Sequence, residues 1–319
     1  MTMSQHLRMR TVVGWPAGQS VLVLLALVGG VRAQASTPDT AKVESAAATG
    51  SGAHDQTLAV VWMQRSAEYR AACLQAYRTA MRSLEEAVVD DTWTASLEQG
   101  ATEVYRNLPL AVVLDVDETV LDNTAYAARC IGEGQPFAAA SWAKWVHEQQ
   151  AGALPGALAY TLRANELGMR VVYITNRRSD SADPQASSSE ESDTRVNLKK
   201  LGFPLDERDG FDVVLTRGEH GDKSARRRVV AERFRIVQLV GDNLGDFAPG
   251  VEPRQKDLPQ GHEVEGAAVE SSRARLVDDL ASWWGQRWIL IPNPAYGSFE
   301  SVVRAQHSNL RDALRTQQQ

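Results

Sequence analysis

The sequence predicts a doubly wound α/β domain, in which helices flank a Rossmann-like parallel sheet and a smaller, mostly helical cap is attached. Three observations support this prediction. Short runs rich in Val, Ile and Leu recur after Pro109, helical stretches separate them, and polar residues directly follow several of the runs. Near-continuous apolar runs are typical of strands buried on both faces of a parallel sheet. Polar residues at the carboxyl ends of such strands indicate the edge where ligands bind.

Length and composition allow a large buried core. The chain has 319 residues, of which 43% are hydrophobic, and this excludes a disordered tail or a disulfide-bonded miniprotein. The length fits one large domain or two smaller ones. Because 34 Lys and Arg residues oppose 40 Asp and Glu residues, the formal net charge is −6. This balance gives no broad attraction for phosphates, so we expect no nucleic-acid polymer as a partner. The basic cluster Arg226–Arg228 is interpreted as a solvated helix face.

The first 35 residues differ from the rest of the chain. A basic segment precedes an apolar run from Val21 to Val31, and the small-x-small pattern Ala33-Gln34-Ala35 follows it. We interpret residues 1–35 as a secretory signal peptide with cleavage at Ala33 or Ala35. An uncleaved anchor is the alternative, but the run is too short for the roughly 20 apolar residues that span a bilayer. We therefore expect an exported protein, most simply in a bacterial periplasm, with no stable membrane insertion after cleavage.

Folded structure is expected from residue 57 onward. Residues 36–56 are rich in Ser, Thr, Ala and Gly without apolar periodicity, which predicts a flexible leader. From Leu58 to Val88, apolar residues recur at steps of three or four, which predicts one long amphipathic helix. This N-terminal segment and the inserted segments are expected to form the cap.

The predicted core alternates strands and helices. Strands are expected at residues 110–115, 171–175, 212–216, 236–240 and 288–291. Helices are expected at residues 155–168, around 194–202 and at 222–234. Loops or insertions are expected at residues 179–194, which are acidic and rich in Ser, and at 248–274, with a disordered tail over 313–319. This alternation indicates a single α/β core over residues 57–312.

The sequence contains two cysteines, Cys73 and Cys130. An oxidising compartment would permit them to form a disulfide. Two unpaired buried thiols are an equally good interpretation. Two isolated cysteines do not make a zinc site.

The first polar motif follows the strand expected at residues 110–115. Asp115, Asp117, Glu118 and Asp122 place four carboxylates within eight positions beside an apolar run. Side chains alternate along a strand, so Asp115 and Asp117 are expected on one side. Carboxylates with a nearby backbone carbonyl suit a hard cation such as Mg²⁺. A solvated acidic turn is the alternative interpretation of this motif alone.

Polar residues also follow three later segments. Asp242 directly follows an apolar strand, with Asp246 four residues further on, and Asp242 can complete a metal site. Thr175 ends another strand and is followed by Asn176 and Arg177, whose donors suit an oxyanion or phosphate. Lys223 lies at a loop-to-helix junction, where helix amides and an ammonium group can face an anion.

In this order, Asp115-x-Asp117-x-Thr119, Thr175-Asn-Arg, Lys223 and Gly241-Asp242-Asn243-x-x-Asp246 resemble the four motifs of haloacid-dehalogenase (HAD) superfamily phosphotransferases. The match is closer to the bacterial class C acid phosphatases of that superfamily. Similar stretches extend over roughly residues 58 to 302, including SWAKWV and IPNPAYGSFE. The resemblance implies a HAD-like core and the hydrolysis of small phosphomonoesters.

The resemblance also implies roles for individual residues. Asp115 is the expected nucleophile, which forms an aspartyl-phosphate, and Asp117 is the expected general acid and base. Mg²⁺ is the expected cofactor, bound by Asp115, Asp242 and the Asp117 carbonyl. Thr175 and Lys223 are expected to hold the phosphoryl group, while Asp246 supports Lys223 or the metal.

Substrate recognition is implied at aromatic residues in the matching stretches. The candidates for a clamp around the leaving group are Tyr126, Trp142, Trp145 and Tyr296. The resemblance points to nucleoside 5′-monophosphates and aryl phosphates as substrates. The relatives are commonly lipoproteins, but this sequence has no lipobox cysteine, and its insertion after residue 178 is longer than the compact family pattern.

Two other functions remain open on the sequence. One is a phosphotransferase that passes the phosphoryl group to an alcohol or nucleoside. The other is an exported binding protein that keeps the fold without catalysis, although the motif residues are all present. The sequence leaves the formation of a homo-oligomer open.

Overall fold

The computed structural model describes residues 56–100, 103–218, 220–251, 263–307 and 309–316. The chain divides into two units, residues 1–47 and 48–319, and every described residue belongs to the second. The predicted signal peptide, the predicted leader up to residue 55 and the last three residues of the predicted tail therefore lie outside the described residues.

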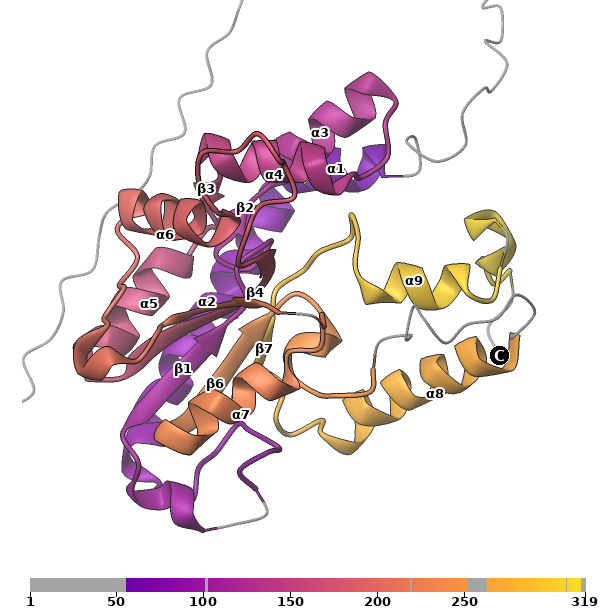
Figure 1. The fold of residues 1–319 in the computed structure, drawn as a ribbon. Helices are drawn as coiled ribbons and strands as arrows, with labels where there is room; N and C mark the ends of the chain where they lie inside the picture. The colour runs from indigo at the N-terminus through magenta and orange to yellow at the C-terminus, as the bar shows by residue number, and fades with distance from the viewer. Residues whose placement is uncertain (1–55, 101–102, 219, 252–262, 308, 317–319) are drawn as a thin grey trace, which may run out of the picture. The chain divides into compact units, whose positions relative to one another are not determined.

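A parallel sheet of five strands forms the core, in the order β5-β4-β1-β6-β7 (Figure 1). Its strands are β1 (Leu110–Leu114), β4 (Arg170–Arg178), β5 (Val214–Arg217), β6 (Arg235–Gly241) and β7 (Trp288–Leu290). Every residue of β6 is buried, as expected for a central strand covered on both faces. All five predicted strands are confirmed, and β4 extends three residues beyond its predicted end, through Arg178.

Helices cover the sheet in the manner of a doubly wound fold. The chain steps from β1 to β4 to β5, and then returns to β6 and β7. Because crossovers between parallel strands are right-handed, this reversal puts helices on both faces and leaves a switch point between β1 and β6. The main helices are α2 (Ala67–Val89), α5 (Ala157–Glu166), α6 (Glu190–Leu201), α7 (Ser224–Arg233) and α8 (Glu263–Asp279). On one face α2 packs against α5, β6 and β7.

The single long helix predicted from Leu58 to Val88 is wrong. The structure has two helices, α1 (Thr57–Arg65) and α2, separated by Ser66. Ser66 has extended backbone angles, and its side chain accepts a hydrogen bond from the Tyr69 amide, 3.0 Å away. Ser66 therefore caps a new helix, which an apolar repeat of three and four residues does not reveal.

Two predicted loops are partly helical. Helix α6 starts at Glu190, inside the segment 179–194, because Ser189 accepts a hydrogen bond from the Ser192 amide and caps it. Residues 263–274 belong to α8, although the segment 248–274 was expected to be a loop. In the first case polarity concealed the helix, since α6 begins with several acidic residues, which are favourable at a helix N-terminus.

The cap follows β1 in the chain. It contains β2 (Leu121–Asp122), α3 (Thr124–Glu133), α4 (Ala139–Glu148) and β3 (Gly152–Ala153). Strands β2 and β3 pair antiparallel, and α1 packs against α3, so the N-terminal and inserted segments meet as predicted (Figure 1). The remaining elements are α9 (Ser298–Arg304) and the 3₁₀ turns η1 (Val104–Asn107), η2 (Arg208–Gly210), η3 (Leu244–Asp246) and η4 (Leu310–Ala313).

The two cysteines are unpaired. Cys73 is buried in α2 and Cys130 is half-buried in α3, so the alternative of two free thiols is confirmed. Burial raises the pKa of the Cys73 thiol to about 11. Among the described residues, no helix has the length and apolar character needed to cross a membrane.

Candidate active site

Asp115 and Lys223 meet at the switch point of the sheet. Asp115 directly follows β1, and its amide donates a hydrogen bond to the carbonyl of Val240 on β6 at 2.9 Å. Lys223 is the N-cap residue of α7, as predicted for this junction. Its ammonium group donates hydrogen bonds to Asp115 Oδ1 and, at 2.6 Å, to Asp246 Oδ1. Two predicted site residues from distant segments therefore bind the same ammonium group.

Three carboxylates form a candidate cation site around this contact. One oxygen from each of Asp115, Asp242 and Asp246 lies within 4.8 Å of the others. Asp242 accepts hydrogen bonds from Thr119 Oγ1 at 3.2 Å and from Asn293 Nδ2 at 2.8 Å. Asp115 and Asp242, which were predicted to share a metal site, therefore lie close together. Asp246 belongs to the same cluster and also accepts a hydrogen bond from Lys223.

Charge in this cluster favours a divalent cation. Burial raises the pKa of Asp115 well above its ordinary value, although Lys223 opposes this shift, and burial with the nearby Asp246 raises the pKa of Asp242 to about 6. Burial opposes the charge of Lys223, but the adjacent Asp115 and Asp246 carboxylates raise its pKa. When all groups are ionised, three carboxylates and one ammonium leave two negative charges. Carboxylate oxygens suit a hard divalent ion, so these residues fit one.

Asp117 lies apart from the carboxylate cluster. Arg177 donates to Asp117 Oδ1 from Nη2 at 2.7 Å and from Nε at 3.0 Å, and Thr175 Oγ1 donates to Oδ2 at 3.3 Å. The Asp117 carboxylate thus binds a guanidinium group and a hydroxyl group from β4. Arg177 was expected to bind phosphate, but its side chain is directed to Asp117.

Asn123 completes this arrangement, and the sequence analysis missed it. It is the N-cap residue of α3, but its side chain makes no capping hydrogen bond. Instead its Nδ2 donates to Asp117 Oδ1 at 2.9 Å, and its Oδ1 accepts from Trp145 Nε1 at 2.8 Å. Its amide donates to the buried Glu118 at 2.7 Å, and Glu118 has a left-handed φ of 56°. The sequence offered one signal for Asn123: it is a polar residue near the end of the motif VVLDVDETVLDNT, directly before the helix α3.

The remaining predicted residues lie around this centre. Asn176 is exposed, and its Oδ1 accepts from Arg226 Nη2 at 2.7 Å. Tyr126 and Trp142 pack edge to face with ring centroids 5.1 Å apart, and the exposed ring of Phe137 lies 6.1 to 6.2 Å from both. Trp145 is buried, and its indole N–H is occupied by Asn123. Tyr296 lies between β7 and α9, with 37% of its surface exposed.

Comparison with known proteins identifies the family. Residues 26–299 match the model of HAD superfamily subfamily IIIB, described as acid phosphatase. The chain belongs to this family of acid phosphatases. The sequence-based resemblance is therefore confirmed, and the family is one of phosphomonoester hydrolases.

Solved structures of class C acid phosphatase agree with this assignment. The enzyme from Bacillus anthracis aligns with a TM-score of 0.64 and 26% identity, over 83% of this chain and 99% of that chain. A tungstate-bound structure of the same enzyme has a TM-score of 0.63 and 24% identity over the same shares, a likeness that concerns the fold alone.

Curated relatives match a smaller share of the chain. A stem 31 kDa glycoprotein of Glycine max is 26% identical over 171 residues, which are 52% of this chain and 56% of the relative. A stem 28 kDa glycoprotein of the same plant is 27% identical over 142 residues, 43% of this chain and 52% of the relative. The chain thus spans about half the length of the curated relatives it matches.

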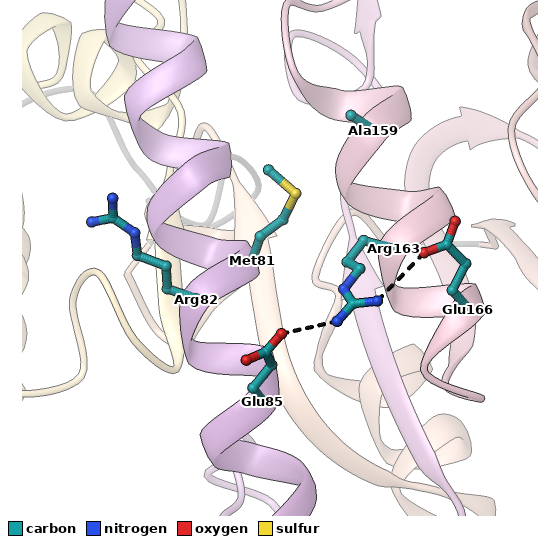
Figure 2. Close-up of a pocket in the computed structure, with 6 residues that line it drawn as sticks. All are labelled: Met81, Arg82, Glu85, Ala159, Arg163 and Glu166. Atoms are coloured by element: carbon teal, nitrogen blue, oxygen red, sulfur yellow. Dashed lines mark hydrogen bonds and ion pairs between the residues drawn. The ribbon is translucent and has the colours of Figure 1, made fainter. Parts of the chain in front are cut away.

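The protein also has an open groove between α2 and α5 (Figure 2). Six residues line it: Met81, Arg82, Glu85, Ala159, Arg163 and Glu166. Arg163 donates to Glu85 at 2.9 Å and to Glu166 at 3.5 Å, and all three side chains are exposed. Because none of the family motif residues lines this groove, we assign the active site to the carboxyl edge of the sheet instead.

Proposed function

We propose that the protein is an exported, Mg²⁺-dependent acid phosphatase that hydrolyses small phosphomonoesters through an aspartyl-phosphate. One observation carries this proposal: the ammonium group of Lys223 binds Asp115 within a cluster of carboxylates. Asp117, two residues further along the chain, instead accepts hydrogen bonds from a separate set of donors that includes Arg177. Family membership supports the reaction class.

The first step transfers the phosphoryl group to the protein. A carboxylate oxygen of Asp115 forms a bond to phosphorus as the bond between phosphorus and the ester oxygen breaks. The proton of Asp117 passes to the ester oxygen, which leaves as an alcohol, and Asp117 becomes a carboxylate. Lys223 offsets the negative charge that gathers around Asp115 during this step.

The second step releases phosphate. Asp117 accepts a proton from water as the water oxygen forms a bond to phosphorus and the bond from phosphorus to Asp115 breaks. The products are inorganic phosphate and the protonated Asp117, which restores the starting state. Asp115, Asp242 and Asp246 would hold the Mg²⁺ ion, which supplies positive charge to the phosphoryl oxygens.

Aromatic side chains support substrates with a base or aryl group. The ring pair of Tyr126 and Trp142, with the exposed Phe137 beside it, offers apolar faces on the cap. Stacking of one base on such a ring contributes about 1–3 kcal/mol. We therefore propose nucleoside 5′-monophosphates and aryl phosphates as substrates. Export to the periplasm rests on the signal-like segment at residues 1–35.

Hydrolysis by the protein from about residue 36 onward tests this proposal. Turnover of p-nitrophenyl phosphate and of 5′-nucleotides should require Mg²⁺ and should stop in EDTA. The Asp115→Asn variant should lose at least about 10³-fold in kcat, since the nucleophile is removed. Asp180→Asn changes an exposed ion pair with Arg178 and serves as the matched control with near-normal rates. Full turnover by Asp115→Asn, or full turnover in EDTA, would contradict the mechanism.

A further inference from the structure

We propose that Arg177 and Asn123 are positioning residues that fix the Asp117 carboxyl group for proton transfer. The inference rests on the proposed hydrolysis, in which Asp117 exchanges a proton with the ester oxygen and then with water. It assigns Asn123 a role in that site and gives Arg177 a different role from phosphate binding.

The two oxygens of Asp117 have different surroundings. Oδ1 accepts short hydrogen bonds from Arg177 Nη2 at 2.7 Å, Asn123 Nδ2 at 2.9 Å and Arg177 Nε at 3.0 Å. Oδ2 has only longer contacts, at 3.3 Å, from Thr175 Oγ1 and Arg177 Nε. Charge-assisted contacts from a planar guanidinium are the stronger ones and fix orientation. Oδ1 is therefore the more firmly anchored oxygen, and Oδ2 is the less constrained one.

The positioning residues are themselves held in place. Arg177 is 2% exposed, its Nη1 donates to Thr194 Oγ1 at 3.1 Å, and its guanidinium lies 5.5 Å from the centre of the Trp142 ring. Asn123 is also 2% exposed, and its Oδ1 accepts from Trp145 Nε1 and, at 3.2 Å, from Arg177 Nη2. Buried networks of this kind keep one geometry, because water does not compete for the donors.

The direction of the Arg177 side chain separates positioning from phosphate binding. Each nitrogen of its guanidinium donates to a protein acceptor: Nε to Asp117, Nη1 to Thr194, and Nη2 to Asp117 and Asn123. Arg177 therefore acts on the reaction through Asp117. A phosphate-binding arginine would instead leave donors directed to the ligand.

Leaving-group basicity distinguishes these roles. Phenyl phosphate releases a more basic phenolate than p-nitrophenyl phosphate and has almost the same shape, so its cleavage depends more on a proton from Asp117. A positioned general acid contributes roughly 10²–10⁴-fold to rate. If Asp117 loses its orientation, kcat/KM for phenyl phosphate should fall at least about tenfold more than kcat/KM for p-nitrophenyl phosphate.

The experiment measures kcat/KM for both substrates in the Mg²⁺-loaded protein and in the variants Arg177→Ala, Arg177→Lys and Asn123→Ala. We expect the selective loss on phenyl phosphate in all three variants. Millimolar guanidinium should partly restore the ratio in Arg177→Ala, because it replaces the missing fork of donors. Arg178→Ala is the matched control: Arg178 is the next residue of β4, its side chain is 42% exposed, and it pairs with Asp180.

Each outcome is decisive. Equal losses on the two substrates in folded variants would overturn the inference and favour phosphate binding by Arg177. Removal of one partner from a buried ion pair can unfold a protein. If Arg177→Ala fails to fold, the comparison uses the other two variants. Asn123→Ala keeps Arg177 beside Asp117, and Arg177→Lys keeps a positive charge there. No turnover by the wild-type protein would contradict the proposed function itself, which is a separate result.

Discussion

Gly241 permits the close approach of Asp246 to the end of β6. A Cβ atom at Gly241 would lie 2.6 Å from Asp246 Cγ, well inside van der Waals contact. Asp246 is held there because its Oδ2 accepts from the Asn243 amide at 2.9 Å and its Oδ1 accepts from Lys223. The absence of a side chain at position 241 is thus what lets this carboxylate reach Lys223.

The Gly241→Ala variant should therefore displace Asp246 from Lys223. Changes to residues that support metal ligands typically cost about 10–100-fold in affinity or activity, and we expect a loss in this range in Mg²⁺ affinity and kcat/KM. Gly218→Ala is the control, because a Cβ there meets no atom within 4 Å. Unchanged Mg²⁺ affinity in a folded Gly241→Ala protein would show that the position of Asp246 has no influence on the site.

Sequence reasoning predicted the site residues whose chemistry is visible in the pattern. Asp115, Asp242 and Lys223 follow predicted strands or open a predicted helix, so topology brought them together as expected. Arg177 was found but expected to face phosphate, because a strand-end arginine does not show which partner its side chain selects. Asn123 was missed because its buried contacts are with residues on β4 and α4, far away in the chain.

At the scale of elements, one hydrogen bond decides where α2 begins. Ser66 Oγ accepts from the Tyr69 amide, and Glu68 lies in the first turn, where a negative charge is favourable. We expect Ser66→Ala to lower the free energy of unfolding by about 1 kcal/mol, the usual cost of a lost N-cap. Urea denaturation of the protein from about residue 36 onward measures this change.

The matched variant for this prediction is Ser66→Asp, which keeps an oxygen acceptor at the cap position. It should unfold close to the wild-type midpoint. If Ser66→Ala and Ser66→Asp have equal stability, the cap has no energetic role, and the break between α1 and α2 has another cause.

The strands were predictable and the helix boundaries were not, for a physical reason. Strands such as β6 are buried along their whole length, so their apolar runs are continuous and easily seen. Helix starts depend on single polar side chains, such as Ser66 and Ser189, which accept one amide each. Helix α6 was partly hidden because its first turn contains Glu190, Glu191 and Asp193 and resembles a solvated loop.

At the scale of the whole domain, the parallel sheet collects like charges from distant segments. Asp115 follows β1, Asp242 follows β6, and Asp246 lies in η3, so their carboxylates meet because the carboxyl ends of β1 and β6 are adjacent. When all three carboxylates are ionised, Lys223 balances one negative charge and leaves two. Folding therefore brings together charges that repel each other until a cation is bound, and stability and metal binding are linked.

This linkage predicts the response of thermal stability to metal. At pH 7, above the pKa of about 6 that burial gives Asp242, millimolar Mg²⁺ should raise Tm, while K⁺ at equal ionic strength should not. A ligand at 100 times its Kd contributes about 2.7 kcal/mol to the free energy of unfolding. Asp242→Asn removes one of the two uncompensated charges. Thr119 and Asn293 donate to different oxygens of Asp242, so the single side-chain oxygen of asparagine keeps one of these two hydrogen bonds. Without metal, the Tm of this variant should be higher than that of the wild type. Mg²⁺ should raise the Tm of the variant by less than it raises the Tm of the wild type. An equal rise in Tm in both proteins would show that Asp242 does not bind the ion.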